Sequence, residues 1–336
     1  MTGKYQIVLY NNKVHYRLTV ERNLTILRGD SATGKSELIR LLTVHNGNPR
    51  SSGITLICDK ECTVLNDGNW QLFLQTYRSR IFFIDEGNAF LRTKEFADSV
   101  SGSDNYFVII SRESLPQLPY SVDEIFGLRE GKDAGRYREP KRVYNEMYRI
   151  YGSFLGLRAL PDLVITEDSN SGNEFFQILF PGRCISSQGK SNIKRLLLAH
   201  ANQTVLAVVD GAAFGPEMQD CTEIAGAYGS SVSIFAPESF EYLILQSGLI
   251  EVPKAILEET WDYADSVKYF SWEEFFTSYL TDASRNQVYQ YSKRNLNSFY
   301  KTLGSIDRIK KTLPDSICSF LESAQPVDQQ NTDCID

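Results

Sequence analysis

The chain has 336 residues, of which 42% are hydrophobic and 23% are charged, so it is long enough for two domains with sizeable cores. No apolar run reaches the roughly 18–20 residues that a membrane helix needs, and the first residues lack the pattern of a secretory signal. We therefore expect a cytoplasmic protein with no membrane partner. The formal net charge of −7 provides no overall attraction to nucleic acid.

The cysteines do not suggest a structural framework. Six are scattered along the chain, which favours free thiols over disulfides. Cys58 and Cys62 form a CxxxC pattern, but no second Cys or His pair has matching spacing. We therefore do not expect a structural zinc site.

Three short strands are predicted at the start of the chain. Residues 6–10 and 15–20 flank the turn-forming sequence Asn11-Asn12-Lys13, which favours a β-hairpin. Residues 24–27 form an apolar, β-prone run that we interpret as a buried strand. A helix with an apolar face is predicted over residues 37–42.

A phosphate-binding motif lies between that strand and that helix. Residues 29–36 match the pattern GxxxxGK[ST], whose glycines let backbone N–H groups approach phosphate oxygens closely. Lys35 is predicted to reach the β- and γ-phosphates of a nucleotide, and the Ser36 hydroxyl to ligate Mg²⁺. The predicted nucleotide-binding residues of this loop are Gly29, Asp30, Ser31, Ala32, Thr33, Gly34, Lys35 and Ser36.

A second acidic strand supports nucleotide chemistry. Residues 81–84 form an apolar strand that ends in Asp85 and Glu86, the Walker B pattern. Such a strand delivers Asp85 to the carboxyl edge of a parallel sheet, where it can hold Mg²⁺. Glu86 is then placed to activate the attacking water, so Glu86 and Lys35 are the predicted catalytic residues.

The next predicted strand, residues 106–110, ends in Ser111 and Arg112. Either residue is a candidate sensor of the γ-phosphate, and an ordinary strand terminus is the alternative. A hairpin that leads into a P-loop strand resembles the opening of ABC-type ATPases. However, the chain has no LSGGQ-like signature between Ser36 and Ile81, so the ABC dimer mechanism is not supported. The lack of a guanine-reading NKxD motif favours ATP over GTP.

Glycine, proline and dense charge predict a basic linker over residues 129–158. It separates a P-loop domain, residues 1–128, from a second domain at residues 159–252. The basic residues from Arg129 to Arg142 are an alternative candidate for the lid of a nucleotide or polynucleotide kinase.

The second half alternates strands and helices, which implies a parallel sheet with helices on its faces. Buried strands are predicted over residues 162–168, 204–210 and 231–235. The first ends in Glu167 and Asp168, and the second ends in Asp210. Clustered carboxylates at strand ends suit Mg²⁺.

This layout resembles the Toprim domain of topoisomerases, primases and nucleases of the overcoming-lysogenisation-defect class. In that family a glutamate follows the first strand and a DxD motif follows a later strand. Glu167 matches the glutamate and Asp210 matches the first acid of DxD, but Ala212 stands where the second acid is expected. Residues weighed as substitutes or neighbours of that acid are Glu217, Asp220, Glu238 and Glu241.

The pairing of a P-loop with a Toprim-like domain resembles bacterial ATPase–Toprim defence proteins. That resemblance implies ATP and Mg²⁺ as cofactors, a metal site at Glu167 and Asp210, and action on nucleic acid in phage defence or in a mobile element. The alternative is a protein in which ATP switches the assembly of identical copies or the binding of a protein partner, while the second domain has no catalytic role.

The last third is predicted to be a helical region, residues 253–322, followed by a disordered polar tail, residues 323–336. Ser271 is a candidate N-cap for a helix that starts at Trp272. Between Arg285 and Lys311, seven basic residues alternate with tyrosines and Phe299. This composition suits a nucleic-acid backbone, and an amphipathic helix with a solvated basic face is the alternative.

Overall fold

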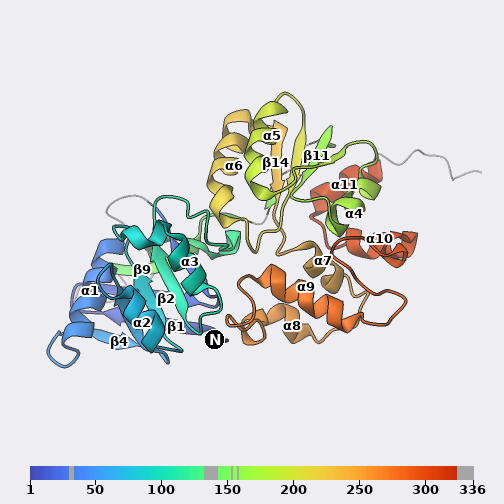
Figure 1. Ribbon diagram of the computed structural model, residues 1–336. Coiled ribbons are helices and arrows are strands. Elements are labelled where there is room, and N and C mark those ends of the chain that lie inside the picture. Colours follow the sequence, from blue (N-terminus) through green and yellow to red (C-terminus); the bar gives the residue numbers. More distant parts are fainter. Residues whose placement is uncertain (30–33, 132–142, 153, 157–158, 324–336) are drawn as a thin grey trace, which may run out of the picture. The chain divides into compact units, whose positions relative to one another are not determined.

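The computed structural model describes residues 1–29, 34–131, 143–152, 154–156 and 159–323. The chain divides into two compact units, each assembled from several segments. The first unit comprises Met1–Gly152, Gly211–Gln219 and Pro253–Phe276, and the second comprises Ser153–Asp210, Asp220–Val252 and Thr277–Asp336. The chain is thus a mixed α/β protein (Figure 1). No helix in the described part is long and apolar enough to cross a membrane.

The first unit is built on a nine-stranded sheet in the order β4-β1-β2-β9-β8-β3-β7-β6-β5. Strands β8, β3, β7, β6 and β5 run parallel to one another. The predicted hairpin is confirmed, because β1 pairs with β2 in antiparallel register and Asn11 closes the turn. The strand bounds are β1 Tyr5–Tyr10, β2 Val14–Val20, β3 Leu24–Leu27, β4 Thr55–Ile57, β5 Cys62–Leu65, β6 Ile81–Ile84, β7 Tyr106–Ile110, β8 Ile125–Glu130 and β9 Val143–Arg149.

The sheet is curled. A flat sheet of nine strands would be about 38 Å wide at the usual strand spacing. Its two edge strands, β4 and β5, are joined by the short connection from Cys58 to Glu61. A chain crossing from Ile57 to Cys62 can span at most about 18 Å. The two edges of the sheet must therefore approach each other at this end.

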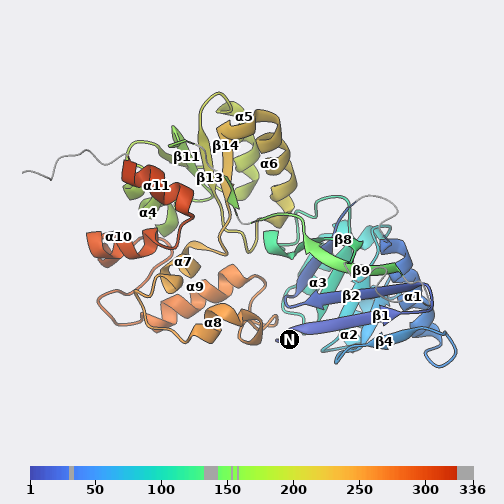
Figure 2. The same ribbon diagram turned by 180° about the vertical axis from the view of Figure 1, so that it is seen from behind.

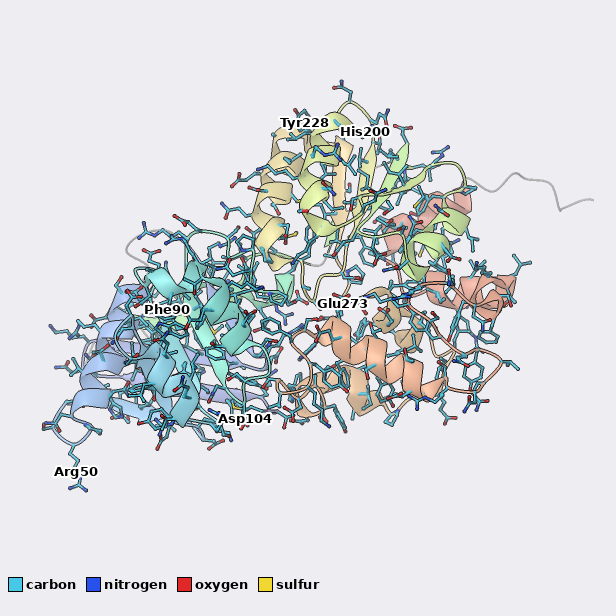
Figure 3. The ribbon with its side chains drawn as sticks, in the orientation of Figure 1. Arg50, Phe90, Asp104, His200, Tyr228 and Glu273 are labelled. Carbon is cyan, nitrogen blue, oxygen red and sulfur yellow. The ribbon has the colours of Figure 1, made fainter. Side chains whose placement is uncertain are left out.

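Helix α1 (Lys35–Gly47) packs on one face of the sheet, where Leu38, Leu41 and Leu42 join a core with Ile7 and Phe83 (Figure 2). A second core covers the other face and contains residues from α2 (Trp70–Thr76), η1 (Ala89–Arg92) and α3 (Lys94–Val100). Within it, Trp70 stacks on Phe90, which Figure 3 labels, with ring centroids 5.1 Å apart. With aliphatic and aromatic side chains on both faces, the central strands can be wholly apolar.

Two later segments complete the first unit. The backbone N–H of Val122, at the start of η2 (Val122–Glu124), donates to the carbonyl of Gly211, and that of Gly215 donates to Tyr120. Farther along the chain, Asn23 donates to the carbonyl of Phe270, and the Arg22 guanidinium lies 3.5 Å from the ring centre of Trp272. The first unit therefore extends beyond the N-terminal domain predicted from the sequence.

Residues 129–158 were predicted to form a linker. In the part of this range that the structure describes, strands are found instead. β8 and β9 form an antiparallel pair, and β9 also pairs with β2. Arg129 in β8 forms an ion pair with Glu146 in β9 at 3.4 Å. The exposed charged residues of these strands, Arg129, Glu130 and Arg149, are part of the dense charge that predicted a linker. The candidate lid falls mostly on residues 132–142, which lie outside the described part of the chain.

The second unit contains a five-stranded sheet in the order β10-β14-β13-β11-β12. Its bounds are β10 Phe154–Leu155, β11 Leu163–Thr166, β12 Cys184–Ser186, β13 Val205–Val208 and β14 Val232–Phe235. All pairs are parallel except β10 with β14, which confirms the parallel arrangement predicted for the second half. Four helices lie between or after these strands: α4 Ser171–Leu179, α5 Ile193–Ala199, α6 Gly215–Tyr228 and α7 Phe240–Gln246.

The region predicted to be helical, residues 253–322, is helical but is divided between the two units. The predicted cap is confirmed, because the Ser271 hydroxyl accepts from the backbone N–H of Glu274 at the start of α9. The predicted tail falls almost entirely on residues 324–336, outside the described chain. The helices are α8 Lys254–Glu258, η5 Thr260–Asp262, α9 Trp272–Ala283, η6 Ser298–Lys301, α10 Leu303–Lys310 and α11 Asp315–Ser323.

Candidate functional site

Three parallel strands of the first unit end at the same level. β7 lies between β3 and β6, with Leu27 opposite Ile110 and Ile84 opposite Ile109. The segments that follow these strands therefore meet at one carboxyl edge of the sheet, the place where ligands bind in open α/β sheets. The P-loop, Ser111, Arg112, Asp85 and Glu86 all follow these strands.

The glycines that bound the P-loop have the backbone conformation that the motif requires. Gly29 has a φ of 128° and Gly34 has a φ of 86°, backbone angles that residues with a Cβ atom rarely adopt. α1 begins at Lys35, so its N-terminal dipole faces the loop. Four predicted ligands, Asp30, Ser31, Ala32 and Thr33, lie outside the described residues.

Lys35 is bonded to the first glycine of the motif. Its side chain is buried, and its Nζ donates to the carbonyl oxygen of Gly29 at 2.9 Å. The bond joins the last part of the motif back to its first residue.

A tyrosine that the sequence did not single out fixes the other end of the loop. The Tyr16 hydroxyl donates to the carbonyl oxygen of Gly34 at 2.8 Å. A Cβ on residue 34 would lie 2.9 Å from the Tyr16 hydroxyl oxygen. Burial raises the pKa of Tyr16 well above its usual value, so the hydroxyl keeps its proton. No local motif marks Tyr16, because its role depends on the packing of β2 against the start of α1.

The predicted metal ligands of this edge are an exposed hydroxyl and a half-buried carboxylate. Ser36 is exposed in the first turn of α1, and Asp85 follows β6 directly. Asp85 Oδ1 accepts from the backbone N–H of Glu86 at 2.9 Å, which orients the carboxylate at the strand end. A hydroxyl and a carboxylate are oxygen donors of the kind that Mg²⁺ prefers.

The structure separates the two candidate sensors. The Ser111 hydroxyl is buried and donates to the carbonyl of Glu113 at 2.7 Å, so it stabilises its own loop. Arg112 is exposed, and its Nε lies 3.3 Å from Glu86 Oε2. The predicted base and a predicted sensor are therefore joined by an ion pair that reaches from the end of β6 to the end of β7.

A second missed residue is Arg28, which immediately precedes the loop. It is only 6% exposed, and its guanidinium donates to Gln219 Oε1 at 3.0 Å and to the Tyr120 hydroxyl at 3.3 Å. Its backbone N–H donates to Phe126 at 2.7 Å. A buried arginine in this position anchors the chain from which the P-loop departs.

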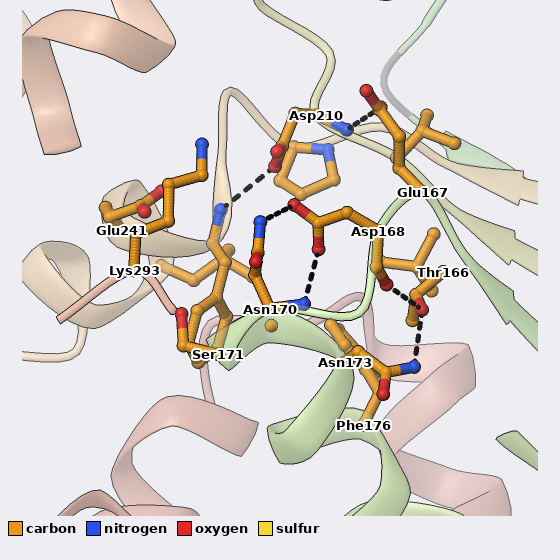
Figure 4. A pocket seen from close by; sticks show the side chains of 16 residues that line it. Thr166, Glu167, Asp168, Asn170, Ser171, Asn173, Phe176, Asp210, Glu241 and Lys293 are labelled. Atoms are coloured by element: carbon orange, nitrogen blue, oxygen red, sulfur yellow. Dashed lines mark hydrogen bonds between the residues drawn. The ribbon is translucent and has the colours of Figure 1, made fainter. Parts of the chain in front are cut away.

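The second unit has its own pocket at a carboxyl edge, shown in Figure 4. Glu167 and Asp168 follow β11, and Asp210 follows β13, the neighbouring strand. All three acids line the pocket together with Lys293 and Glu241. The predicted metal-binding residues Glu167 and Asp210 are therefore brought together by the fold.

The acids of this pocket are oriented by backbone N–H groups. Glu167 Oε2 accepts from the N–H of Asp210 at 3.1 Å, and Asp210 Oδ1 accepts from the N–H of Phe240 at 3.3 Å. Asp168 accepts from both the backbone and the side chain of Asn170. No group of three or more His, Cys, Asp and Glu side chains in the described residues has the arrangement of a metal site.

The substitutes considered for the missing DxD acid lie elsewhere. Ala212 is 2% exposed and belongs, like Glu217, to the first unit. Asp220 accepts from Lys194 at 2.8 Å on the surface. Of the four acids weighed, only Glu241 lines the pocket.

Glu241 belongs to a buried hydrogen-bonded chain in the pocket wall. It is 1% exposed and its Oε1 accepts from the Tyr291 hydroxyl at 2.7 Å, which in turn lies 2.6 Å from the Ser171 hydroxyl. Burial, and then the negative charge of Glu241, raise the pKa of Tyr291 well above its usual value. The segment around Tyr291 is thereby fixed to α4 and α7.

In the basic segment from Arg285 to Lys311, Tyr289 and Phe299 are half-buried, and the two other aromatic residues are not available for stacking. Tyr291 and Tyr300 are 1% and 0% exposed and belong to the core. Two of its cations are paired with acids, Arg285 with Asp282 and Lys301 with Glu174. Lys293 instead lines the acidic pocket, which the sequence did not indicate.

No protein-family model matches the chain, and no curated protein matches it at a significant level. We therefore base the functional proposal on the residues at the two strand edges.

Proposed function

We propose that the first unit is a P-loop ATPase that binds ATP with Mg²⁺ and hydrolyses it. The observation that carries this proposal is the buried Lys35 ammonium, bonded to Gly29 between two glycines of positive φ at the start of α1. Phosphates suit this position because a helix N-terminus and an ammonium group both favour negative charge. Asp85, Glu86 and Arg112 at the same edge provide the remaining groups for hydrolysis.

Each residue has a distinct role in the proposed reaction. Lys35 binds the terminal phosphates, while Ser36 and Asp85 would hold Mg²⁺, which supplies positive charge to the phosphate oxygens. Glu86 orients the attacking water and accepts its proton. Arg112, exposed beside Glu86, contacts the γ-phosphate and positions Glu86 through their ion pair.

Calorimetry tests nucleotide binding directly. We expect heat on titration with Mg-ATP, weaker heat with Mg-GTP, and a roughly 10- to 150-fold loss of ATP affinity in Lys35→Ala, because a charged hydrogen bond is worth about 1.5–3 kcal/mol. Lys94→Ala, which changes an exposed lysine of α3, is the matched control. Unchanged affinity in Lys35→Ala would contradict the proposal.

The second unit supports a second proposal, a Toprim-like domain that binds Mg²⁺ and acts on nucleic acid. Its support is the pocket in which Glu167, Asp168 and Asp210 lie at the ends of two adjacent parallel strands. Carboxylates at such positions would hold a divalent cation, which stabilises charge on a phosphodiester. The alternative is a second unit that carries no chemistry and responds to ATP by changing its binding to a protein partner.

Incubation with plasmid and single-stranded DNA in Mg²⁺ or Mn²⁺ separates these alternatives. Cleavage that disappears in Glu167→Ala supports the nuclease. An intact ATPase that cleaves no DNA supports the ATP-controlled switch. Transfer of phosphate to an added nucleotide or polynucleotide would instead indicate a kinase.

A further inference from the structure

The two edges of the curled sheet are joined by one short piece of chain. β4 ends at Ile57 and β5 begins at Cys62, and these are the outermost strands of the nine. Because β4 runs opposite to β3 and β5 runs parallel to it, this junction lies at the sheet edge opposite the P-loop. Cys58 and Cys62 stand at its two ends.

The two cysteines are separated by a turn of three residues. Both sulfur atoms contact the backbone of the same residue, Lys60. The Lys60 N–H donates to Cys58 Sγ at 3.4 Å, and Cys62 Sγ donates to the Lys60 carbonyl at 3.7 Å. The turn thus places both sulfur atoms against the backbone of one residue, at the point where the two edge strands are joined.

The environments of the two sulfurs differ in a way that assigns their roles. Cys58 is half-buried, whereas Cys62 is 3% exposed. The neighbouring Cys62 thiol lowers the pKa of Cys58 to about 7, whereas the Cys58 thiol and burial raise the pKa of Cys62. A thiol whose pKa is near the ambient pH is the best nucleophile towards disulfides. Cys58 is therefore the attacking thiol and Cys62 the resolving one.

We propose that Cys58 and Cys62 are a redox-modification site at which a small-molecule disulfide of the glutathione type forms a reversible covalent clasp between the two edges of the sheet. The Cys58 thiolate attacks one sulfur of the small disulfide, forms a mixed disulfide and releases one thiolate. Cys62 then loses its proton and displaces the second thiolate, which leaves a Cys58–Cys62 disulfide. The protein dithiol is oxidised, and the small disulfide is reduced to two thiols.

The Cys58–Cys62 site lies beside the last turn of α1. Asn46 Nδ2 donates to the Cys62 carbonyl at 2.9 Å, and Asn46 Oδ1 accepts from the Val64 N–H at 3.2 Å. A covalent bond at Cys62 therefore restrains the strand to which the end of α1 is attached. Reversible disulfides of this kind are compatible with a reducing compartment when they act as sensors. The proposal does not depend on nucleotide binding.

Differential alkylation of the full chain tests the clasp. The reduced protein is incubated with glutathione disulfide, alkylated, reduced and alkylated again with a heavy reagent, and its peptides are identified by mass. A Cys334→Ser background removes the cysteine outside the described residues. We expect Cys58 and Cys62 to be protected together, and at least about tenfold faster than Cys184, because burial raises the pKa of Cys184 to about 12.

Two variants distinguish the attacking thiol from the resolving one. Cys62→Ser is expected to retain a stable glutathione adduct on Cys58, because no thiol displaces it. Cys58→Ser is expected to leave Cys62 unmodified, and circular dichroism verifies that both variants are folded. The proposal is overturned if Cys58 and Cys62 both remain open to alkylation in the oxidised wild-type protein. It is equally overturned if the wild-type protein accumulates the adduct found in Cys62→Ser.

Discussion

The chain places acidic residues at the carboxyl edges of two parallel sheets, but the two edges are equipped differently. In the first unit, a glycine-bounded loop, Lys35 and Arg112 accompany the acids Asp85 and Glu86. In the second unit, Glu167, Asp168 and Asp210 line a pocket with a single lysine, Lys293. The first edge thus has cations beside its acids, whereas the acids outnumber the single lysine at the second edge.

The two units also bury a carboxyl group in different ways. Glu124 in the first unit is 1% exposed, accepts from the Thr25 hydroxyl at 2.8 Å, and lies 3.5 Å from Arg22 Nε. Glu241 in the second unit has the neutral Tyr291 hydroxyl as a partner. Four experiments test these contrasts, two on the edges and two on the buried acids.

The largest effect is expected for Glu86→Gln. Removal of a general base typically lowers the rate by about 100- to 10,000-fold. We therefore expect phosphate release from ATP to fall by at least about 100-fold, while calorimetric affinity for Mg-ATP is retained. Glu113→Gln is the control, because Glu113 is an exposed acid in the segment after β7 and is paired with Arg92. A loss of binding equal to the loss of rate would place Glu86 in the nucleotide site as a ligand.

Metal affinity at the second edge should respond to Glu167→Ala. Calorimetry with Mn²⁺ and no nucleotide isolates this pocket, because the P-loop site shares its metal with phosphate oxygens. Loss of one charged ligand is expected to weaken binding about tenfold or more. Asp307→Ala removes an exposed acid of α10 and should have no effect. Equal Mn²⁺ affinity in both variants would show that Glu167 is not a ligand.

Tyr291→Phe tests the buried chain in the second unit. The change removes the hydroxyl between Ser171 and Glu241 and leaves a buried carboxyl group without that donor. The free energy of unfolding should fall by roughly 1–3 kcal/mol, measured by urea denaturation. Tyr228→Phe, on a tyrosine that is 44% exposed, is the matched control. If both variants have the same stability, the chain is not a stabilising feature.

The smallest effect is a dependence of stability on pH in the first unit. Burial raises the pKa of Glu124 from its ordinary value of 4.5 to about 8. The group's contribution to stability is therefore complete below pH 4.5 and is lost as the pH rises through the folded-state pKa. Glu124→Gln should remove this dependence, and its stability relative to wild type should rise by about 1 kcal/mol or more between pH 5 and 8. Parallel pH profiles of the two proteins in thermal melts would contradict this assignment.

Local patterns predicted most of the strands that carry the two edges. Residues 81–84 are apolar throughout, and the run from Leu24 to Leu27 is apolar except for Thr25. Both faces of the sheet are covered at these strands, and such runs are easily identified. The sequence did not predict β9 because its side chains are mostly polar or partly exposed, and only Asn145 is buried. The pairing of β9 with β2 and β8 shows that it belongs to the sheet. Arg28 and Tyr16 were missed because their partners are distant in sequence.

The sequence alone determined the P-loop motif, the acids at the strand ends and the alternation of strands and helices in the second half, because each depends on residues close together in the chain. Only the tertiary structure decided which strands are neighbours, that β7 lies between β3 and β6, and that Glu86 meets Arg112. It alone removed Tyr291 and Tyr300 from the surface and showed that the turn from Cys58 to Cys62 joins the two edges of the sheet. These relations depend on how a curled sheet and its cores bring distant segments together, and no local pattern encodes them.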